Sequence, residues 1–506
     1  MKDSWDREAI ESSGFADLET GLFGPAVASP PLTTPQGNRQ RPSLEPPLTP
    51  KAWARTVCRV QTASTECSPP MTVIASTLPA SSTSFGKPLF RCALGALALL
   101  AASALPASAD ALPDRITALL AVACEAPYSD PQRFRSALGD IKIISHTVNT
   151  MGDAPGRAKT VLIDEDGSEI QISTLFPAGR LRRIGIEISD PAPRLSVNAD
   201  HMCRVTEVRD IVYTPQGIAD VVRVLSADMQ TTISEEPLNP PVPIGKDPAG
   251  ITVGVIDSGI DYTVAPFQDH LARDSDGKLI GRDLWDMDDR PFDVDTSRSP
   301  FFPLHHGSAV ASVLLNEAPM ARIIPVRYPR PDMARLADAV AFFAAHDVRI
   351  VNMAMGSNSI DDWTAFAAAA QQHPNMLFIL SAGNNGRDID QVPVYPAALD
   401  LPNTIVVTSS TLDGRLAQGS NWGAAHVDIM VPGERVEVID HRGAAGKASG
   451  SSFAVPRVSA LAVRLLAANP DWDGPALRDA ILKRARTLDG PQRVRFGWIP
   501  DPTDGP

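Results

Sequence analysis

Positive charge is in short supply in this chain of 506 residues. The 46 lysines and arginines are outnumbered by 59 aspartates and glutamates, which gives a formal net charge of −13. This balance disfavours binding to nucleic acid or to an anionic membrane through a basic surface. The few basic clusters, such as Arg180, Arg182 and Arg183, are typical of solvated faces.

The apolar run near the start of the chain is too short for a comfortable membrane span. The run at residues 92–105 is only about 14 residues long, whereas a spanning helix needs about 20. It follows Lys87 and Arg91 and precedes Ala-Ser-Ala at 107–109, which is the pattern of a cleaved secretory signal. Residues 71–109 are therefore predicted to be a signal peptide, removed after Ala109. We expect the mature protein to be secreted or periplasmic, without stable membrane association; an uncut signal anchor is the alternative.

Aliphatic runs are few at the start of the chain. Residues 1–70 contain ten prolines and many serines and threonines. Such a segment cannot bury enough apolar surface to offset its chain entropy. It is predicted to be disordered, or untranslated if Met71 is the true start.

Cysteine is scarce, with five residues in the chain and none beyond position 203. Cys58, Cys67 and Cys92 precede the predicted cut and would be lost with it. Cys124 and Cys203 remain, an even pair in an oxidising compartment, and they predict one disulfide. Two buried, inert thiols are the alternative.

Several familiar motifs are incomplete. Segment 274–277 (Asp-Ser-Asp-Gly) lacks the downstream Glu of an EF-hand, and segment 443–447 lacks the spacing and final Ser or Thr of a phosphate loop. Eight aspartates nevertheless crowd one segment: Asp274, Asp276, Asp283, Asp286, Asp288, Asp289, Asp293 and Asp295. An acidic surface loop is the commoner interpretation, so no cofactor is expected; calcium, which prefers clustered carboxylates, is the alternative.

Residues 110–233 are predicted to form a separate α+β domain. The patterns predict a helix over 115–125, a hairpin of strands 160–163 and 168–173, a strand over 183–188 and a helix over 216–229. The five prolines of residues 234–250 then predict an exposed linker and a site of processing.

Three short segments carry an acid, an imidazole and a hydroxyl, in that order. They are 256–260 (Ile-Asp-Ser-Gly-Ile), 306–311 (His-Gly-Ser-Ala-Val-Ala) and 450–456 (Gly-Ser-Ser-Phe-Ala-Val-Pro). Asp257 ends a β-branched run typical of a buried parallel strand, and His306 and Ser452 each precede an apolar stretch with helical spacing. Serine needs a base to take its proton, and the base needs a carboxylate to fix its tautomer, so these residue types predict a nucleophilic relay.

The order Asp, His, Ser along the chain is the subtilisin order, and residues from about 250 to 490 resemble the subtilase family of serine proteases. The resemblance implies a parallel-sheet α/β catalytic domain over 251–490, preceded by the smaller α+β domain and followed by a tail at 491–506. It also implies a serine endopeptidase that acts on polypeptides.

The same resemblance assigns roles to single residues. Ser452 would attack the scissile carbonyl, His306 would act as base and then acid, and Asp257 would orient His306. Asn384 stands in a Gly-Asn turn after an apolar strand, where the family's oxyanion donor lies. His305 is adjacent to His306, but only His306 precedes Gly-Ser in the family register.

Two further segments resemble substrate-binding parts of the family. In segment 350–357, Ala354, Met355 and Gly356 would pair with an extended substrate, as in β-augmentation; an ordinary interior strand is the alternative. Val394 would close the bottom of the S1 pocket. Many family members carry glycine there, so the resemblance implies a shallower pocket.

Alternatives remain open for the whole chain and for its first domain. The family is commonly made with a propeptide, so residues 110–233 are interpreted either as an inhibitor of the cleft or as a permanent accessory domain. A catalytically silent pseudoprotease that captures extended peptides is the main rival to the enzyme. An esterase or peptide ligase using the same acyl-enzyme is a second rival.

Overall fold

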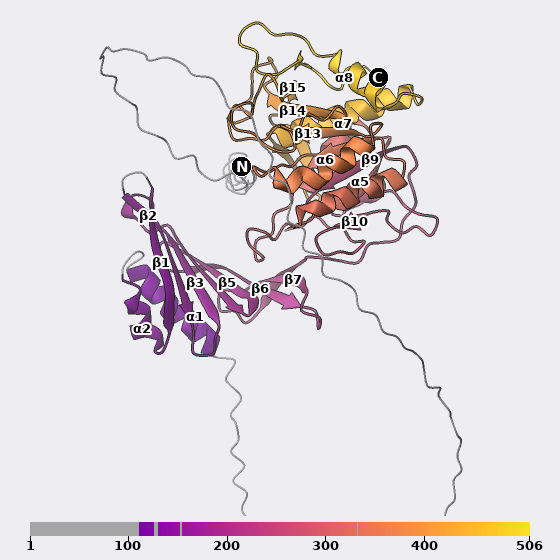
Figure 1. The fold of residues 1–506 in the computed structure, drawn as a ribbon. Coiled ribbons are helices and arrows are strands. Elements are labelled where there is room, and N and C mark those ends of the chain that lie inside the picture. Colours follow the sequence, from indigo (N-terminus) through magenta and orange to yellow (C-terminus); the bar gives the residue numbers. More distant parts are fainter. Residues whose placement is uncertain (1–110, 126–129, 152–153, 331, 506) are drawn as a thin grey trace, which may run out of the picture. The chain divides into compact units, whose positions relative to one another are not determined.

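The computed structural model describes residues 111–505 except 126–129, 152–153 and 331 (Figure 1). The leader predicted at 1–70 and the signal peptide predicted at 71–109 lie outside the described residues.

The first described region is an antiparallel meander with two helices. The helices are α1 (Ala111–Glu125) and α2 (Gln132–Leu138). The strands are β1 (Lys142–Met151), β2 (Ala154–Ile163), β3 (Glu169–Leu175), β4 (Arg183–Asp190), β5 (Ala192–Asp200), β6 (Val205–Tyr213), β7 (Ala219–Leu225) and β8 (Thr232–Pro237), and they pair in sequence order. Alternate residues of β3 and β4 are buried, so this sheet has one apolar face. Ile116 and Leu119 of α1 pack there against Ile172 and Ile184, which makes the region α+β.

Most sequence predictions for this region are confirmed. Residues 115–125 are helical, β2 and β3 pair as a hairpin, and β4 covers the strand predicted at 183–188. The helix predicted over 216–229 is wrong, because β7 occupies this stretch between β6 and β8. The β-branched residues Val221, Val222 and Val224 suit a strand, and the neighbouring strands supply its hydrogen bonds.

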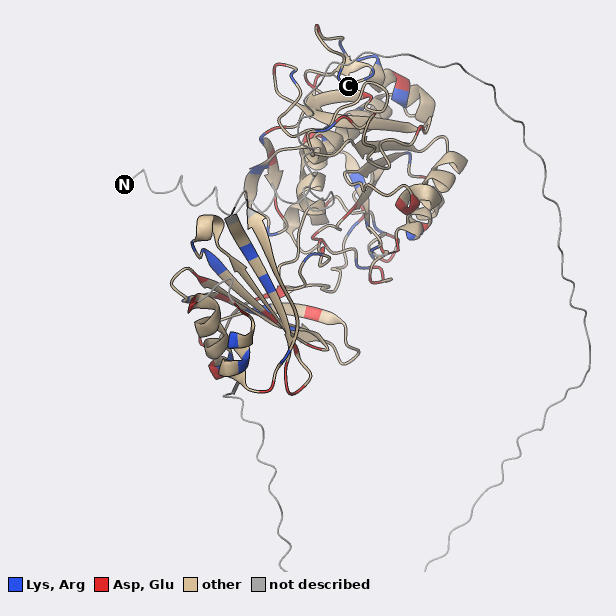
Figure 2. Ribbon diagram, turned by 60° about the vertical axis from the view of Figure 1, so that its left-hand side comes forward, with Lys and Arg blue, Asp and Glu red and all other residues tan. Residues whose placement is uncertain are grey.

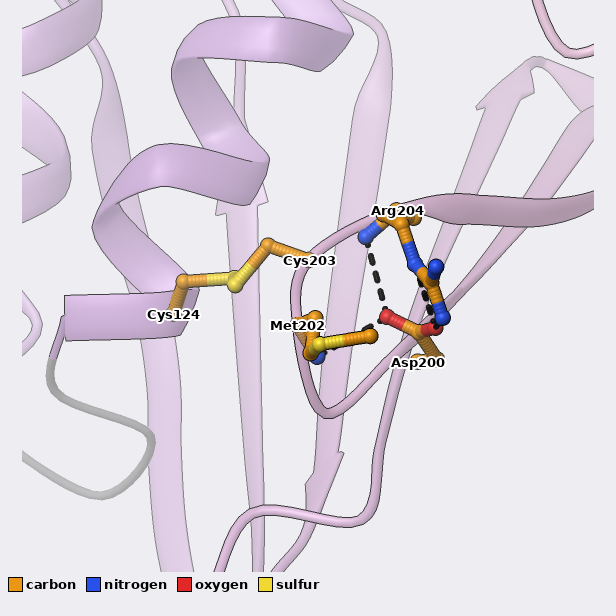
Figure 3. Close-up of a disulfide and its surroundings, with 5 residues drawn as sticks. All are labelled: Cys124, Asp200, Met202, Cys203 and Arg204. Atoms are coloured by element: carbon orange, nitrogen blue, oxygen red, sulfur yellow. Dashed lines mark hydrogen bonds and ion pairs between the residues drawn. A yellow bond between two sulfur atoms is a disulfide. The ribbon is translucent and has the colours of Figure 1, made fainter.

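A disulfide joins the end of α1 to the turn between β5 and β6 (Figure 3). Cys124 and Cys203 have Cα atoms 6.1 Å apart and are separated by 79 positions in the sequence. Asp200 holds the turn, since its carboxylate accepts hydrogen bonds from the Met202 amide at 2.8 Å and from the Arg204 guanidinium at 2.7 Å. The covalent link therefore ties the helix to the sheet that it covers.

The proline-rich segment 234–250 is largely exposed, as its composition predicts, but contacts at several points fix it to the fold. Residues 232–237 form β8, and Leu238 and Asn239 are buried. Asp247 accepts hydrogen bonds from the Arg322 guanidinium at 2.9 Å and from the Arg273 amide at 2.8 Å. Prolines suit such a segment, because its main chain is held by side chains and turns and needs few ladder hydrogen bonds.

The second region contains an eight-stranded parallel sheet. The order is β10 (Arg282–Asp283), β11 (Ala321–Arg327), β9 (Ile251–Asp257), β12 (Ile350–Met353), β13 (Leu377–Ser381), β14 (Thr404–Ser410), β15 (Ile429–Pro432) and β18 (Gly497–Trp498). The helices are α3 (Ala265–Gln268), α4 (Gly307–Glu317), α5 (Leu336–Ala345), α6 (Thr364–Gln372), α7 (Ser451–Ala468) and α8 (Gly474–Leu482). A separate hairpin pairs β16 (Val436–Ile439) with β17 (Ala445–Ala448).

Both faces of this sheet are covered, which explains its near-continuous apolar strands. Val253 and Val255 of β9 face one core with α4, α7 and α8, whereas Ile256 belongs to the opposite core with α5 and α6. The helix α7 is long and apolar enough to cross a membrane, but most of it is buried in this core. The region is therefore α/β, as the sequence predicts.

The end of the chain differs from the expected tail. Gly497 and Trp498, which we assigned to the tail at 491–506, form β18 and pair with β15. The amide of Phe496 also donates to the Asp428 carbonyl oxygen at 2.8 Å. A two-residue edge strand is too short to give a periodic pattern, so the sequence did not predict it.

Candidate active site

The candidate site lies where the parallel strands β11, β9, β12 and β13 end. Asp257 is the last residue of β9, and its side chain is 3% exposed. The amide of Tyr328, just beyond β11, donates to the Asp257 carbonyl oxygen at 2.9 Å. Carboxyl ends of neighbouring parallel strands form the usual crevice for chemistry in α/β sheets.

An acid and an imidazole meet in this crevice. The Nδ1 atom of His306 lies 2.7 Å from Oδ1 of Asp257, and the Ser258 amide donates to the same oxygen at 2.8 Å. A carboxylate at Nδ1 fixes the tautomer in which Nε2 is the proton acceptor. His305 does not contact Asp257 in this way. Its Nδ1 faces the Asp293 carbonyl oxygen, and its ring stacks on that of His441 with ring centroids 3.6 Å apart.

A second buried acid holds His306 in place. His306 caps the N-terminus of α4, where its amide lies 3.0 Å from Oδ1 of Asp293 and the Ser308 amide lies 2.9 Å from Oδ2. Ser258 donates its hydroxyl to Asp293 at 2.6 Å and accepts from the Gly307 amide at 2.9 Å. These contacts satisfy the free amides at the start of the helix, and negative charge there is favoured by the helix dipole.

The charge state of Asp293 follows from the same contacts. Its side chain is fully buried, and burial alone would raise the pKa of its carboxyl group. The interaction with His305 and the hydrogen bonds from Ser258 and Ser308 outweigh burial and hold the pKa below the ordinary value. The sequence places Asp293 only among the calcium candidates, because it stands 13 residues before His306 and no local motif indicates a capping role.

The hydroxyl group comes from the start of α7. Ser452 is the second residue of this helix, is 2% exposed, and lines one cavity together with Asp257 and His306. Its Oγ lies 3.5 Å from the Ala354 carbonyl oxygen. Gly450, the residue before α7, has φ +133°, and a Cβ atom on it would lie 3.0 Å from the Asn384 side chain. The close approach of this main chain to Asn384 therefore requires glycine.

Asn384 faces the same helix start. Its side-chain oxygen accepts hydrogen bonds from the Ser451 amide at 2.8 Å and from the Ser451 hydroxyl at 3.0 Å, which leaves the amide nitrogen as its donor. The loop is fixed by Asn421, whose side chain donates to the Ala382 carbonyl oxygen at 2.8 Å and accepts from the Asn385 amide at 2.9 Å.

The residues expected to bind substrate line this cavity. Ala354, Met355 and Gly356 follow β12, which is itself an interior strand between β9 and β13. Within the described chain, the main-chain groups of Met355 and Gly356 have no main-chain partner. Val394 is buried, and its Cγ1 would be 3.3 Å from a Cβ on Gly356, so the valine narrows this part of the cavity.

Comparison with known proteins identifies the family of this region. The model of the Subtilase family matches residues 248–498. Residues 248–498 belong to the subtilase family. The chain is 24% identical over 273 residues to the Cell wall-associated protease of Bacillus subtilis (strain 168), a match that covers 50% of this chain and 28% of that protein.

Other subtilase relatives are similarly distant. The chain is 25% identical to Subtilisin-like protease 1 of Trichophyton rubrum, in a match that covers 43% of this chain and 42% of that protein. It is 23% identical to Subtilisin BL of Lederbergia lenta, in a match that covers 38% of this chain and 75% of that protein. A solved structure of a cold adapted subtilisin-like serine proteinase aligns with a TM-score of 0.41 and 22% identity, covering 52% of this chain and 93% of that chain. The chain thus spans less than half the length of the first two relatives.

The clustered aspartates of this subtilase region mostly bind arginines and main-chain amides. Asp283 and Asp286 both pair with Arg327, at 2.8 and 2.6 Å, and Asp289 pairs with Arg282 at 2.6 Å. In the part of the chain that the structure describes, no three His, Cys, Asp or Glu side chains converge as a metal site would need. The pairing with Arg327 had no local signal, because Arg327 lies about forty residues further along the chain.

Charges of both signs are interspersed over the described ribbon (Figure 2). Arg180, Arg182 and Arg183 of the first region are all exposed, as predicted for solvated residues. Two arginines, however, line the candidate cleft itself. Arg298 and Arg330 contact the same cavity as His306 and Ser452, and we had given neither a role.

Proposed function

We propose that the protein is a serine endopeptidase that hydrolyses peptide bonds through Asp257, His306 and Ser452. The observation that carries this proposal is the 2.7 Å contact between His306 Nδ1 and Asp257, in a cavity that Ser452 also lines. Membership of the subtilase family supports the same reaction class.

In the proposed reaction, Ser452 Oγ attacks the scissile carbonyl carbon while His306 Nε2 takes the hydroxyl proton. Asp257 stabilises the resulting imidazolium through Nδ1. The carbonyl oxygen becomes an oxyanion, which would accept hydrogen bonds from the Asn384 amide nitrogen and the Ser452 main-chain amide. His306 then gives its proton to the leaving amine, and water repeats the sequence on the acyl-enzyme to release the acid and regenerate the Ser452 hydroxyl.

Substrates of this enzyme would be polypeptides in extended conformation. The main-chain groups of Met355 and Gly356 are available for pairing, which supports strand addition along 354–356. Val394 supports a shallow pocket for the side chain before the scissile bond. The proposed reaction uses only protein groups, substrate and water, so we propose that it needs no cofactor, and activity retained in EDTA would support this.

The test uses a fluorophosphonate probe and casein. The probe is expected to label the wild type and not Ser452→Ala, and only the wild type should digest casein. Ser459→Ala is the matched control, because Ser459 is a buried serine of the same helix that donates to Asn352 Oδ1 at 2.9 Å. If the probe does not label the wild type, the result would favour a catalytically silent peptide-binding protein. If the wild type hydrolyses small esters but not casein, the result would favour an esterase.

We propose further that the chain is exported and that residues 110–233 stay attached as an accessory domain. The contacts of Asp247 with Arg322 and Arg273 support attachment, since they hold the segment after this domain against the subtilase region. N-terminal sequencing of the active secreted protein tests both points. A start near residue 110 is expected, whereas a start near 238–250 would identify a cleaved propeptide.

A further inference from the structure

We propose that Arg330, assisted by Arg298, selects peptide substrates that carry a carboxylate side chain shortly before the scissile bond. The inference rests on the proposed peptidase function and adds a substrate class to it. It starts from the lining of the cleft, where these two cations stand beside the Asp257–His306 pair.

The two arginines reach the cleft from different segments. Arg298 lies in a loop closed by paired main-chain hydrogen bonds between Asp295 and Leu304, both 2.8 Å long. Arg330 follows β11, and the bond from the Tyr328 amide to the Asp257 carbonyl oxygen fixes this segment next to the relay. Both positions are therefore set by the fold around the site.

Arg330 is available to bind a ligand. It is half-buried, and its guanidinium lies over the Tyr328 ring, 5.3 Å from the centroid. Among the residues that the structure describes, no carboxylate forms an ion pair with Arg330, and its Nε atom is buried without a hydrogen-bond partner. A guanidinium with free donors binds a carboxylate through two parallel hydrogen bonds, which a neutral amide cannot match.

The carboxylates of the cleft are already engaged by other groups. Asp295 accepts from the Ser297 amide at 2.8 Å through Oδ1 and from the Tyr328 hydroxyl through Oδ2. Asp257 is bound by His306 and by the Ser258 amide. Neither acid makes an ion pair with Arg330, and Arg330 lines the cavity in which a substrate would lie.

The overall negative charge of the chain does not cancel this preference. Charges more than about 8 Å away are largely screened at physiological salt, so the net charge of −13 matters less to a bound side chain than the nearest guanidinium. The edge 354–356 lines the same cavity and would pair with residues that precede the scissile bond. The carboxylate is therefore expected in that half of the substrate.

The test uses fluorogenic peptides built on a casein site that the enzyme cleaves, with Glu or its isostere Gln at each of the three positions before P1. For the wild type at low salt, kcat/KM should be about three- to fivefold higher with Glu than with Gln at one of these positions. The ratio should fall towards one as NaCl is added. It should also fall in Arg330→Gln, fall further in the Arg298→Gln, Arg330→Gln pair, and reverse in Arg330→Glu.

The matched control is Arg415→Gln, an exposed arginine paired with Asp413 at 2.6 Å, which should keep the wild-type ratio. If the wild type cleaves the Gln peptides and its Glu-to-Gln ratio of kcat/KM is near one at all three positions, the inference is overturned, but the proposed peptidase function is not. A ratio unchanged in the double arginine variant would overturn it equally. Failure to cleave any peptide, together with no probe labelling of Ser452, would overturn the peptidase as well.

Discussion

The side-chain oxygen of Asn384 accepts two hydrogen bonds from Ser451, from the amide at 2.8 Å and from the hydroxyl at 3.0 Å. The Ser451 hydroxyl also lies 2.8 Å from Ser381 Oγ, which accepts from the Gly383 amide at 3.1 Å. Because Ser451 gives its only hydroxyl proton to Asn384, Ser381 must be the donor to Ser451. The chain of donors runs in one direction and ends at the Asn384 side-chain oxygen, so the amide nitrogen is the Asn384 donor that the proposed reaction assigns to the oxyanion.

Ser381→Ala should therefore lower kcat while leaving KM nearly unchanged. The loss of one buried hydrogen bond in the chain corresponds to about a fivefold effect, well below the roughly 10²–10³-fold loss expected for removing an oxyanion donor in Asn384→Ala. Ser381 acts through Asn384, so it is a positioning residue. Steady-state kinetics on one peptide measures both effects.

A double variant separates positioning from general destabilisation. In the Asn384→Ala background, Ser381→Ala should cause little further loss of kcat, because the group that it positions is gone. Ser459→Ala, the buried serine of α7 introduced above, should not lower kcat in either background. Additive losses from Ser381→Ala and Asn384→Ala would contradict the positioning role.

Asp257→Asn should lower kcat by about 10⁴-fold with the fold intact. An asparagine at this position presents either an amide donor or a weaker acceptor to His306 Nδ1, which favours the wrong tautomer of the ring. The measurement is kcat with circular dichroism of both proteins. Asp413→Asn, at an exposed pair with Arg415, should behave as the wild type; a drop below tenfold for Asp257→Asn would remove Asp257 from the relay.

Local patterns predict the strand and the helices that carry the site, because each of these elements has a characteristic pattern within a short stretch of sequence. A β-branched run predicts β9 up to Asp257, and apolar helical spacing predicts α4 and α7 behind His306 and Ser452. Resemblance to a family then supplied the expectation that these elements meet. The structure brings Asp257 and His306 into contact in that way.

The partners of these residues could not be predicted from local patterns. Asp293 lies 15 positions before Ser308, inside an acidic run, and Ser381 looks like an ordinary strand end. Their roles depend on contacts with Ser258 and Ser451 that only the folded sheet creates. The wrong helix at 216–229 has the same cause, because pairing with two neighbouring strands overrides local propensity.

The disulfide should make a large contribution to the stability of the first region. Cys124 and Cys203 close a long loop, with a sequence separation of 79, and a disulfide typically contributes about 2–4 kcal/mol by restricting the unfolded chain. The Cys124→Ser, Cys203→Ser pair should lower the free energy of unfolding in urea by that amount. Non-reducing peptide mapping of the wild type should recover the two cysteines in one cross-linked peptide. Recovery of both as free thiols would contradict the link.

His441 should make the protein less stable as the pH falls from about 6.5 to 4. Its half-buried ring stacks on His305 with ring centroids 3.6 Å apart, and burial, followed by the interaction with His305, lowers its pKa to about 4, against the opposing effects of Asp293 and Asp440. Between these pH values the unfolded chain binds a proton that the folded protein does not, so unfolding is favoured progressively as the pH falls. Below pH 4 this group adds no further loss.

Replacing His441 by phenylalanine keeps an aromatic ring beside His305 and removes the titration. The free energy of unfolding should fall between pH 7.5 and 4.5 by on the order of 1 kcal/mol less in His441→Phe than in the wild type, an amount reduced by the solvent around a half-buried ring. Urea titrations at several pH values give both curves. Parallel curves for the two proteins would mean that His441 is protonated in the folded state as easily as in the unfolded chain, and that burial beside His305 does not disfavour its charge.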